Sequence, residues 1–280
     1  MNKGKIIRIV SNLYTVNVDG INMDCQARGK FRNQRITPLV GDYCEVDIEN
    51  KYIMNILPRK NYLLRPSIAN VDIALIVTSL KKPDFSPILL DKLITIVTLN
   101  QIEPMLLFTK MDLLAKEEIE QWKKVKKYYQ KIGYRVFTNL EINDLKKELK
   151  EKIVVVTGQT GAGKSTLLNK LNEKLELKTS PISEALNRGV HTTRHTELFE
   201  VDDFLIADTP GFSALDLSGF QKEEIRDSFK EFFKYTCKFR DCMHEKEQDC
   251  KVKEAVRNEE ILQSRYKSYL ACVSEVPKWK

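Results

Sequence analysis

The residues best suited to chemistry lie in a glycine-rich loop near the middle of the chain. A β-branched run at 153–157 leads directly into this loop, which reads Gly158, Gln159, Thr160, Gly161, Ala162, Gly163, Lys164, Ser165 and Thr166. Glycines let the backbone turn tightly and direct its N–H groups at phosphate oxygens, and the helix that follows adds a positive dipole end. Lys164 has the reach to contact β- and γ-phosphates, and the Ser165 hydroxyl can bind Mg²⁺. The loop therefore predicts a nucleoside triphosphate site with Mg²⁺ as a cofactor.

A second motif, Thr109, Lys110, Met111 and Asp112, follows a predicted strand at 104–108. The Asp112 carboxylate can accept hydrogen bonds from guanine N1–H and the exocyclic amine, whereas adenine would leave it unpaired. Lys110 would pack over the base and support the phosphate loop. The alternative is that Asp112 is a helix N-cap. Because a complete phosphate loop stands in the same chain, we predict that the nucleotide is a guanine nucleotide.

Two further stretches have the composition of γ-phosphate sensors. Residues 179–196 lack clear periodicity and contain Thr192 and Thr193, either of which could supply the Mg²⁺ ligand that senses the γ-phosphate. A later predicted strand ends in Asp-x-x-Gly. There, Asp208 would hold Mg²⁺ through water, and the Gly211 N–H would meet the γ-phosphate.

A third group of reactive side chains clusters near the C-terminus and consists of Cys237, Cys242, His244 and Cys250. In a reducing compartment such clustering indicates a metal site rather than disulfides. Three thiolates and one imidazole complete a tetrahedral Zn²⁺ site. Four protein ligands leave no open position, so we expect a structural role for the metal.

Sequence periodicity predicts the elements that position these groups. The first sixty residues contain about five short alternating strands with turn signals between them, which favours an OB-fold barrel; an SH3-like barrel is the alternative. From residue 71 onward strands and helices alternate, which predicts a mostly parallel sheet with helices on both faces. Residues 220–235 and 250–272 read as amphipathic helices. We expect an α/β multidomain protein with an OB-fold at 1–62, a nucleotide-binding domain at 63–215 and an α-helical zinc-binding module at 216–280.

The formal net charge of +7 is compatible with nucleic acid as a partner, and equally with ordinary surface lysines. Within the predicted barrel one stretch combines basic residues with an aromatic one: Arg28, Lys30, Phe31, Arg32 and Arg35. Its basic side chains would neutralise RNA phosphates while Phe31 stacks on a base or packs inward. A solvated loop is the alternative.

Hydropathy argues against a membrane protein. No apolar run approaches the roughly 18 residues of a membrane span, and the first residues lack the apolar core of a signal peptide. We therefore expect a cytoplasmic protein.

The order of the motifs carries a family resemblance. In ordinary GTPases the phosphate loop comes first and Asn/Thr-Lys-x-Asp last, whereas here Thr109–Asp112 precedes the phosphate loop, the two threonines and Asp208–Gly211. The chain therefore looks like a circularly permuted P-loop GTPase. With the barrel and the Cys/Cys/His/Cys module, it resembles the ribosome small-subunit-dependent GTPase A family over essentially its whole length.

This resemblance implies an enzyme that hydrolyses GTP to GDP and phosphate. The family binds the small (30S) ribosomal subunit and its 16S rRNA late in maturation; the subunit stimulates hydrolysis, which is coupled to release. We expect a monomer. Only a short connection separates Gly211 from Cys237, so we also expect γ-phosphate contacts to fix the zinc module against the G domain.

Two positions depart from common GTPase patterns. Thr138 and Asn139 stand where many GTPases have Ser-Ala, and we expect their backbone N–H groups to contact the base. Phe212 stands where Ras-like proteins place a water-orienting Gln, so we expect low intrinsic hydrolysis, with help from the partner or from His191 or His195. Either histidine could instead be a passive surface residue. Two other interpretations stay open: an RNA-binding assembly protein with a structural nucleotide, and a GTPase of tRNA modification.

Overall fold

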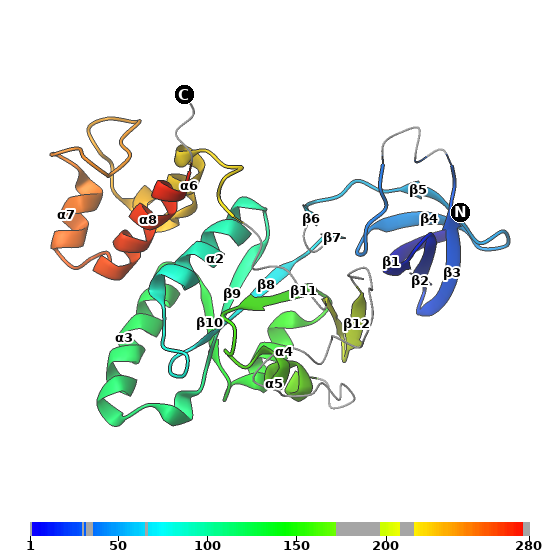
Figure 1. The fold of residues 1–280 in the computed structure, drawn as a ribbon, viewed down its shortest axis with the longest axis horizontal. Coiled ribbons are helices and arrows are strands. Elements are labelled where there is room, and N and C mark those ends of the chain that lie inside the picture. The colour runs from blue at the N-terminus through cyan, green and yellow to red at the C-terminus, as the bar shows by residue number, and fades with distance from the viewer. Residues whose placement is uncertain are drawn as a thin grey trace.

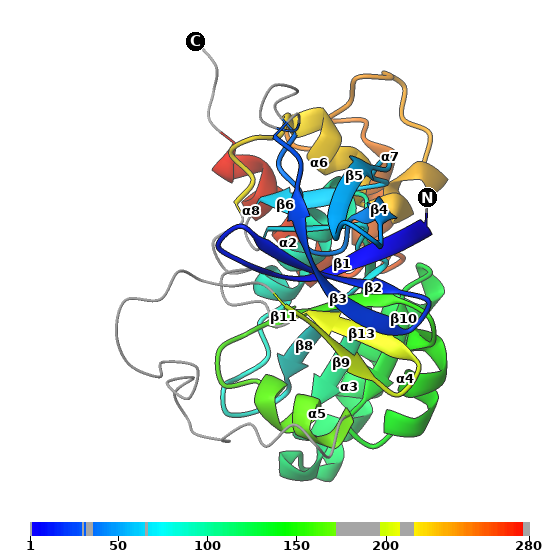
Figure 2. The same ribbon diagram turned by 90° about the vertical axis from the view of Figure 1, so that its right-hand side faces the viewer.

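The computed structural model describes residues 2–29, 31, 36–64, 67–171, 197–207 and 216–276. A β-barrel and a helical module lie on opposite sides of a central α/β domain (Figure 1). Turned by 90°, the barrel lies in front of the central sheet (Figure 2). Among the described residues, no helix has the length and apolar character needed to cross a membrane.

The barrel contains five strands: β1 (Asn2–Val10), β2 (Leu13–Val18), β3 (Ile21–Ala27), β4 (Tyr43–Asp47) and β5 (Tyr52–Ile56). They close in the order β1-β2-β3-β5-β4, with β3 and β5 parallel. Asp19 and Gly20 have positive φ angles of 51° and 85° at the β2–β3 turn, as a two-residue hairpin requires. Alternate side chains, Ile6 and Val16 among them, fill the interior. The barrel is OB-like, as predicted.

A short hairpin, β6 (Tyr62–Leu64) and β7 (Ser67–Ala69), joins the barrel to the central domain. Two buried amides flank it. Asn61 Nδ2 donates to the Val71 and Gln101 carbonyls at 2.8 and 3.0 Å. Asn70 Nδ2 donates to the Gly41 carbonyl of the barrel at 3.0 Å. These bonds satisfy backbone groups at the junction that would otherwise be buried without partners.

The central sheet has the order β10-β9-β8-β11-β13-β12; β12 is antiparallel to β13, and all other neighbouring pairs are parallel. Its strands are β8 (Ile73–Ser79), β9 (Glu103–Thr109), β10 (Arg135–Thr138), β11 (Ile153–Gly158), β12 (Leu198–Val201) and β13 (Phe204–Ala207). Its helices are α2 (Pro87–Leu99), α3 (Lys116–Lys131), α4 (Ile142–Leu149) and α5 (Lys164–Leu171).

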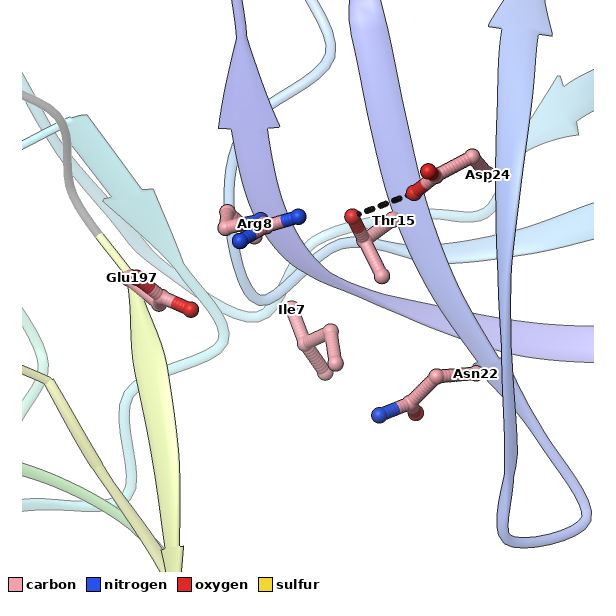
Figure 3. A pocket seen from close by; sticks show the side chains of 6 residues that line it. All are labelled: Ile7, Arg8, Thr15, Asn22, Asp24 and Glu197. Atoms are coloured by element: carbon pink, nitrogen blue, oxygen red, sulfur yellow. Dashed lines mark hydrogen bonds between the residues drawn. The ribbon is translucent and has the colours of Figure 1, made fainter.

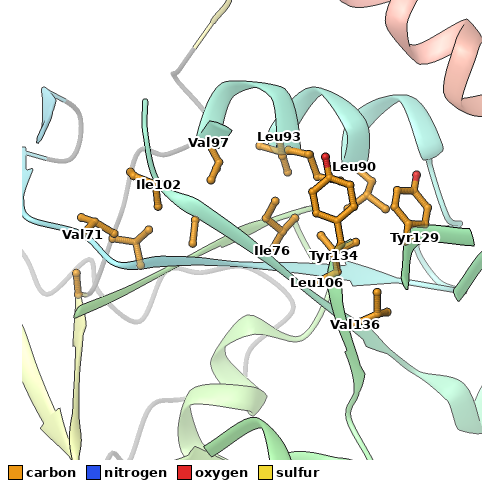
Figure 4. Close-up of a cluster of buried hydrophobic side chains, with 14 of the residues drawn as sticks. Val71, Ile76, Leu90, Leu93, Val97, Ile102, Leu106, Tyr129, Tyr134 and Val136 are labelled. Atoms are coloured by element: carbon orange, nitrogen blue, oxygen red, sulfur yellow. The ribbon is translucent and has the colours of Figure 1, made fainter. Parts of the chain in front are cut away.

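Helices cover both faces of this sheet, so strand β8 is buried at every position. Residues such as Ile76, Leu90 and Tyr129 form the core on the side of α2 and α3 (Figure 4). Leu145 of α4 and Leu167 of α5 belong to the core on the other face. The doubly covered parallel sheet agrees with the alternation of strands and helices in the sequence.

The helical module differs from the two long helices expected at its ends. It consists of α6 (Lys222–Ser228), the 3₁₀ helix η3 (Lys230–Lys234), α7 (Lys251–Arg257) and α8 (Gln263–Glu275). Asn258 ends α7, and Glu259 follows with a φ of 60°, a left-handed conformation that interrupts the helix. The break buries Ile261 in the core of the module. Tertiary packing therefore overrides a helical period that continues through the sequence.

One buried charge network attaches this module to the central domain. Arg265 of α8 is fully buried, and its guanidinium lies 2.6 Å from the Asp91 carboxylate of α2 and 2.7 Å from Glu231 of η3. The Tyr129 hydroxyl of α3 donates to Asp91 at 2.6 Å. The guanidinium also lies 4.2 Å from the Phe229 ring centroid. Removing the cation would leave two buried carboxylates without a counter-charge.

We therefore expect Arg265→Met to lower the free energy of unfolding by roughly 3–5 kcal/mol, the usual result of removing one partner from a buried ion pair. Denaturant unfolding followed by circular dichroism measures the change. Lys123→Met is the matched control, because Lys123 pairs at 2.6 Å with Glu120 on an exposed face and should leave the unfolding midpoint unchanged. Equal midpoints for the Arg265 variant and the parent would contradict this account.

Candidate nucleotide site and metal centre

The predicted nucleotide-binding motifs meet at one edge of the central sheet. Thr109, Thr138 and Gly158 are the last residues of β9, β10 and β11. Ala207, the last residue of β13, directly precedes Asp208. Because these strands are parallel, all four ends lie at the same edge. In open α/β sheets this is the edge at which ligands bind.

The phosphate loop begins where two strands come unusually close. Gly158 has a φ of 134°, and a Cβ at this position would lie 1.9 Å from the Val77 carbonyl oxygen of β8. Gly161 and Gly163 also have positive φ angles, of 76° and 91°. The Ala162 N–H closes the turn on the Gln159 carbonyl at 3.1 Å. The first of these positions therefore accepts only glycine, and the other two strongly favour it.

The loop's lysine lies over its own backbone. Lys164 Nζ donates to the Gly158 and Gln159 carbonyls, each at 2.9 Å. Burial lowers the pKa of Lys164. Ser165 and Thr166 follow in the first turn of α5. The ammonium group and the start of α5 therefore lie together at the phosphate loop, where phosphate binding would need them.

The Thr109–Asp112 motif braces this loop from the neighbouring strand. Thr109 Oγ1 donates to the Ala162 carbonyl at 2.7 Å, and Lys110 Nζ donates to the Gly161 carbonyl at 2.9 Å. Asp112 lies exposed within the 3₁₀ helix η1 (Met111–Leu113). The N-caps of η1 and α3 are Lys110 and Ala115, so Asp112 caps neither helix. The arrangement leaves its carboxylate available to a ligand.

One part of the site was missed in the sequence. The loop between β8 and α2 contacts the phosphate loop, since Lys110 Nζ also donates to the Lys82 carbonyl and Gln159 Nε2 donates to the Asp84 carbonyl at 3.2 Å. The sequence feature that could have indicated this contact is the end of the predicted strand at Ser79, which becomes the end of β8. In a parallel sheet this end lies at the same edge as the other motifs.

The turn after β10 contains the two backbone N–H groups that we expected to contact the base. The Thr138 N–H donates to the Glu141 carboxylate at 2.8 Å, and the Asn139 N–H donates to the Phe108 carbonyl at 2.9 Å. Both groups that we expected to contact a base are therefore used within the fold. The Asn139 N–H extends the pairing with β9 by one bond, whereas the Thr138 N–H is held by the Glu141 side chain.

Several predicted residues lie outside the described part of the chain. They are His191, Thr192, Thr193, His195, Asp208, Gly211 and Phe212 of the nucleotide site, and Lys30, Arg32 and Arg35 of the basic stretch. Arg28 is exposed, whereas only 2 % of the Phe31 surface is exposed and its ring packs in the barrel core. Of the two roles considered for Phe31, the structure has inward packing rather than a stacking platform.

The Cys/His residues converge on one point in the helical module. The donor atoms of Cys237, Cys242, His244 and Cys250 all lie within 4.8 Å of one another. The Cys237 and Cys250 sulfurs are 3.8 Å apart, and His244 Nδ1 lies 3.2–3.6 Å from the three sulfurs. Sulfurs at two corners of a tetrahedral Zn²⁺ site, with Zn–S bonds of about 2.3 Å, are about 3.8 Å apart. The donor set therefore fits Zn²⁺.

The surroundings act differently on the four ligands. Burial raises the pKa of Cys242 to about 12 and also raises that of Cys250. Burial raises the pKa of the Cys237 thiol too, but hydrogen bonds from the Val252 and Lys251 backbone and from the neighbouring thiols together hold its pKa below the ordinary value. Burial also lowers the pKa of His244, with a smaller contribution from Arg226, which favours the neutral imidazole. The Tyr266 hydroxyl donates to the His244 carbonyl at 2.6 Å and holds this part of the loop.

A polar pocket lies apart from both sites, between the barrel and β12 (Figure 3). Arg8 of β1 forms an isolated antiparallel bridge with Glu197, the residue before β12. Thr15 donates to Asp24 at 2.7 Å on the barrel side of the pocket. Among the nucleotide-binding residues that the structure describes, none lines this pocket.

Comparisons with known proteins agree with this geometry. The model of the RsgA GTPase family matches residues 56–218, and that of the RsgA N-terminal domain matches residues 3–53. Small ribosomal subunit biogenesis GTPase RsgA 2 of Oceanobacillus iheyensis is 48% identical over 286 residues, covering 99% of this chain and 98% of that protein. Small ribosomal subunit biogenesis GTPase RsgA of Halalkalibacterium halodurans is 45% identical, and the match covers 99% of this chain and 97% of that protein.

Two solved structures have the same overall fold. YjeQ from Thermotoga maritima matches with a TM-score of 0.85 and 34% identity, covering 98% of each chain. YloQ, described as a circularly permuted GTPase, matches with a TM-score of 0.85 and 35% identity, covering 100% of this chain and 97% of that one. The matches extend over the barrel, the permuted nucleotide domain and the helical module, and this chain is therefore a member of the RsgA family of circularly permuted GTPases.

Proposed function

We propose that this GTPase binds the small (30S) ribosomal subunit through its 16S rRNA and acts in late maturation of that subunit. Hydrolysis of GTP is stimulated by the subunit and coupled to release. The observation that carries the proposal is the full-length similarity to proteins named for small ribosomal subunit biogenesis. A net charge of +7 suits an RNA partner. We further propose that the protein acts as a monomer in the cytoplasm.

The base and the phosphates would occupy the sheet edge described above. Asp112 would read the guanine edge, while Thr109 and Lys110 hold the phosphate loop in position beside it. The loop N–H groups and Lys164 would bind the β- and γ-phosphates. Lys164 would exchange its two backbone carbonyl partners for phosphate oxygens, a stronger charge-assisted interaction.

Residues around the γ-phosphate would complete the site. Ser165 and Asp208 would hold Mg²⁺, which neutralises charge on the phosphates when bound. Thr192 or Thr193, together with Gly211, would sense the γ-phosphate. His191 or His195 would help orient the attacking water, with the subunit supplying further stabilisation.

The Cys/His cluster would hold a structural Zn²⁺. The 3.8 Å separation between the Cys237 and Cys250 sulfurs supports this assignment. Zinc would fix the loop between η3 and α7, which contains few regular elements in the described residues. The metal would then stabilise the module rather than take part in hydrolysis.

The direct test is GTP hydrolysis by the purified protein, alone and with small or large ribosomal subunits. We expect slow hydrolysis alone and a large rise with small subunits only; activating partners of GTPases can give up to roughly 10⁵-fold. Lys164→Ala should abolish the stimulated rate. Equal rates with both kinds of subunit would contradict subunit-specific activation, and no stimulation despite tight GTP binding would favour an RNA-binding protein with a structural nucleotide.

Asp112→Asn should shift nucleotide preference from guanine toward xanthine. An amide can donate to the carbonyl that xanthine has in place of the guanine amine, whereas a carboxylate only accepts. Competition binding with GDP and XDP measures the shift. Asp144→Asn is the control, since Asp144 pairs with Lys147 on an exposed face of α4. An unchanged preference would rule out base reading by Asp112.

Cys250→Ser should reduce the zinc content of the purified protein from one ion per chain to near zero and lower its unfolding temperature. Elemental analysis and thermal unfolding measure the two effects. Cys272→Ser is the control, because Cys272 is buried in the same module but lies outside the cluster. Full zinc occupancy in the Cys250 variant would exclude the proposed ligand set.

A further inference from the structure

One carboxylate shapes the turn that follows β10. Glu141 Oε2 accepts hydrogen bonds from the Thr138 N–H and from Thr138 Oγ1, each at 2.8 Å. The Glu141 N–H donates back to the Thr138 carbonyl at 3.0 Å. Only 5 % of the Thr138 surface is exposed, so water cannot easily replace the carboxylate. Loss of Glu141 would leave a buried N–H unpaired, which is more costly than loss of an exposed hydrogen bond.

A lysine of α3 holds this carboxylate in turn. Lys126 Nζ lies 3.1 and 3.0 Å from the two oxygens of Glu141, and 5.5 Å from the Trp122 ring centroid. Burial raises the pKa of Glu141, but the hydrogen bonds from Thr138 and Lys126 outweigh it, and the pKa lies below its ordinary value. Glu141 is therefore charged at neutral pH and held from two sides.

The turn presents two groups that the fold does not use. Asn139 Oδ1 is buried and has no hydrogen-bond partner among the described residues, and the Leu140 side chain is 76 % exposed. Asn139 is anchored beside the Thr109–Asp112 motif, because its N–H pairs with the carbonyl of Phe108. An unpaired buried acceptor next to an exposed apolar side chain is suited to a flat ring with N–H groups at its edge.

We propose that Glu141, braced by Lys126, is a positioning residue for the guanine base. It sets the turn at 138–141 so that Asn139 and Leu140 form a second wall of the base pocket, across from Asp112. Glu141 itself acts through Thr138 and does not touch the nucleotide. This inference rests on the proposed base site at Asp112. Because hydrolysis takes place at the phosphate loop, Glu141 should affect nucleotide binding and base choice but not the rate at saturating GTP.

The test compares Glu141→Ala with the parent protein in binding and hydrolysis. We expect GDP affinity to fall about tenfold, as for loss of a charge-assisted hydrogen bond, and the preference for GDP over IDP, which lacks the exocyclic amine, to shrink several-fold. The rate at saturating GTP should not change. Lys126→Met should lower GDP affinity and the preference for GDP over IDP by a smaller factor. The double variant should have the GDP affinity of Glu141→Ala alone, because both residues act through one contact.

Glu141→Gln keeps an acceptor for the Thr138 N–H but loses the charge that Lys126 holds, so we expect a GDP affinity between those of the parent protein and Glu141→Ala. If the alanine variant does not fold, the same measurements are made on Glu141→Gln. Asp144→Ala, in the first turn of α4, is the matched control and should bind like the parent protein. Unchanged GDP affinity in Glu141→Ala, or equal losses for GDP and IDP together with a lower unfolding midpoint, would overturn the positioning role. Failure of the base site itself would show separately, as an Asp112→Asn variant that still prefers guanine.

Discussion

A close approach of two backbones sets the position of the phosphate loop. At the end of β11, Gly158 lies against the Val77 carbonyl of β8 with no room for a Cβ. Thr109 and Lys110, at the end of β9, then bond to carbonyls of the same loop. All of these contacts join strand ends that are neighbours in space, and none requires a particular order of the strands along the chain. The guanine-reading motif can therefore precede the phosphate loop in the sequence without altering the site that the two motifs form.

The helical module is attached to the other side of the central domain by a different kind of interaction. The sequence suggested that the short connection from Gly211 to Cys237 would couple this module to the γ-phosphate. In the structure Arg265 binds Asp91 and Glu231 in a fully buried network that holds the module to α2. Glu231 belongs to η3, which lies within the stretch between Gly211 and Cys237. Separating the partners of such a network costs free energy, because it leaves buried charges without a counter-charge. The attachment to α2 is therefore built from buried charges, while the expected link from the γ-phosphate through Gly211 stays a prediction, because Gly211 lies outside the described residues.

The parts that could be predicted from sequence share a local signature. The phosphate loop, the Thr109–Asp112 motif and the four Cys/His residues each combine unusual residue types at short spacing, and strand–helix alternation predicted the sheet. The interactions that escaped prediction join residues distant in sequence, such as Arg265 with Asp91. The inward packing of Phe31 and the break after α7 likewise depend on what surrounds those residues, which periodicity does not report. The internal hydrogen bonds of the Thr138 and Asn139 N–H groups likewise depend on Glu141 and on pairing with β9, which a short sequence motif does not show.

The barrel is joined to the central domain by weaker bonds than the helical module. The Asn61 and Asn70 amides and the Val40–Ile68 bridge hold the hairpin junction. Ile7 and Ile9 of the barrel pack against the core of the central domain, and a further bridge links Arg8 to Glu197. Neutral hydrogen bonds each contribute roughly 0.5–1.5 kcal/mol, less than a buried ion-pair network costs to break. Glu197 also leads into β12, which pairs with β13, and β13 ends beside Asp208. The β12–β13 hairpin therefore connects the edge of the sheet that holds the nucleotide motifs with the barrel, whereas the helical module is attached at α2.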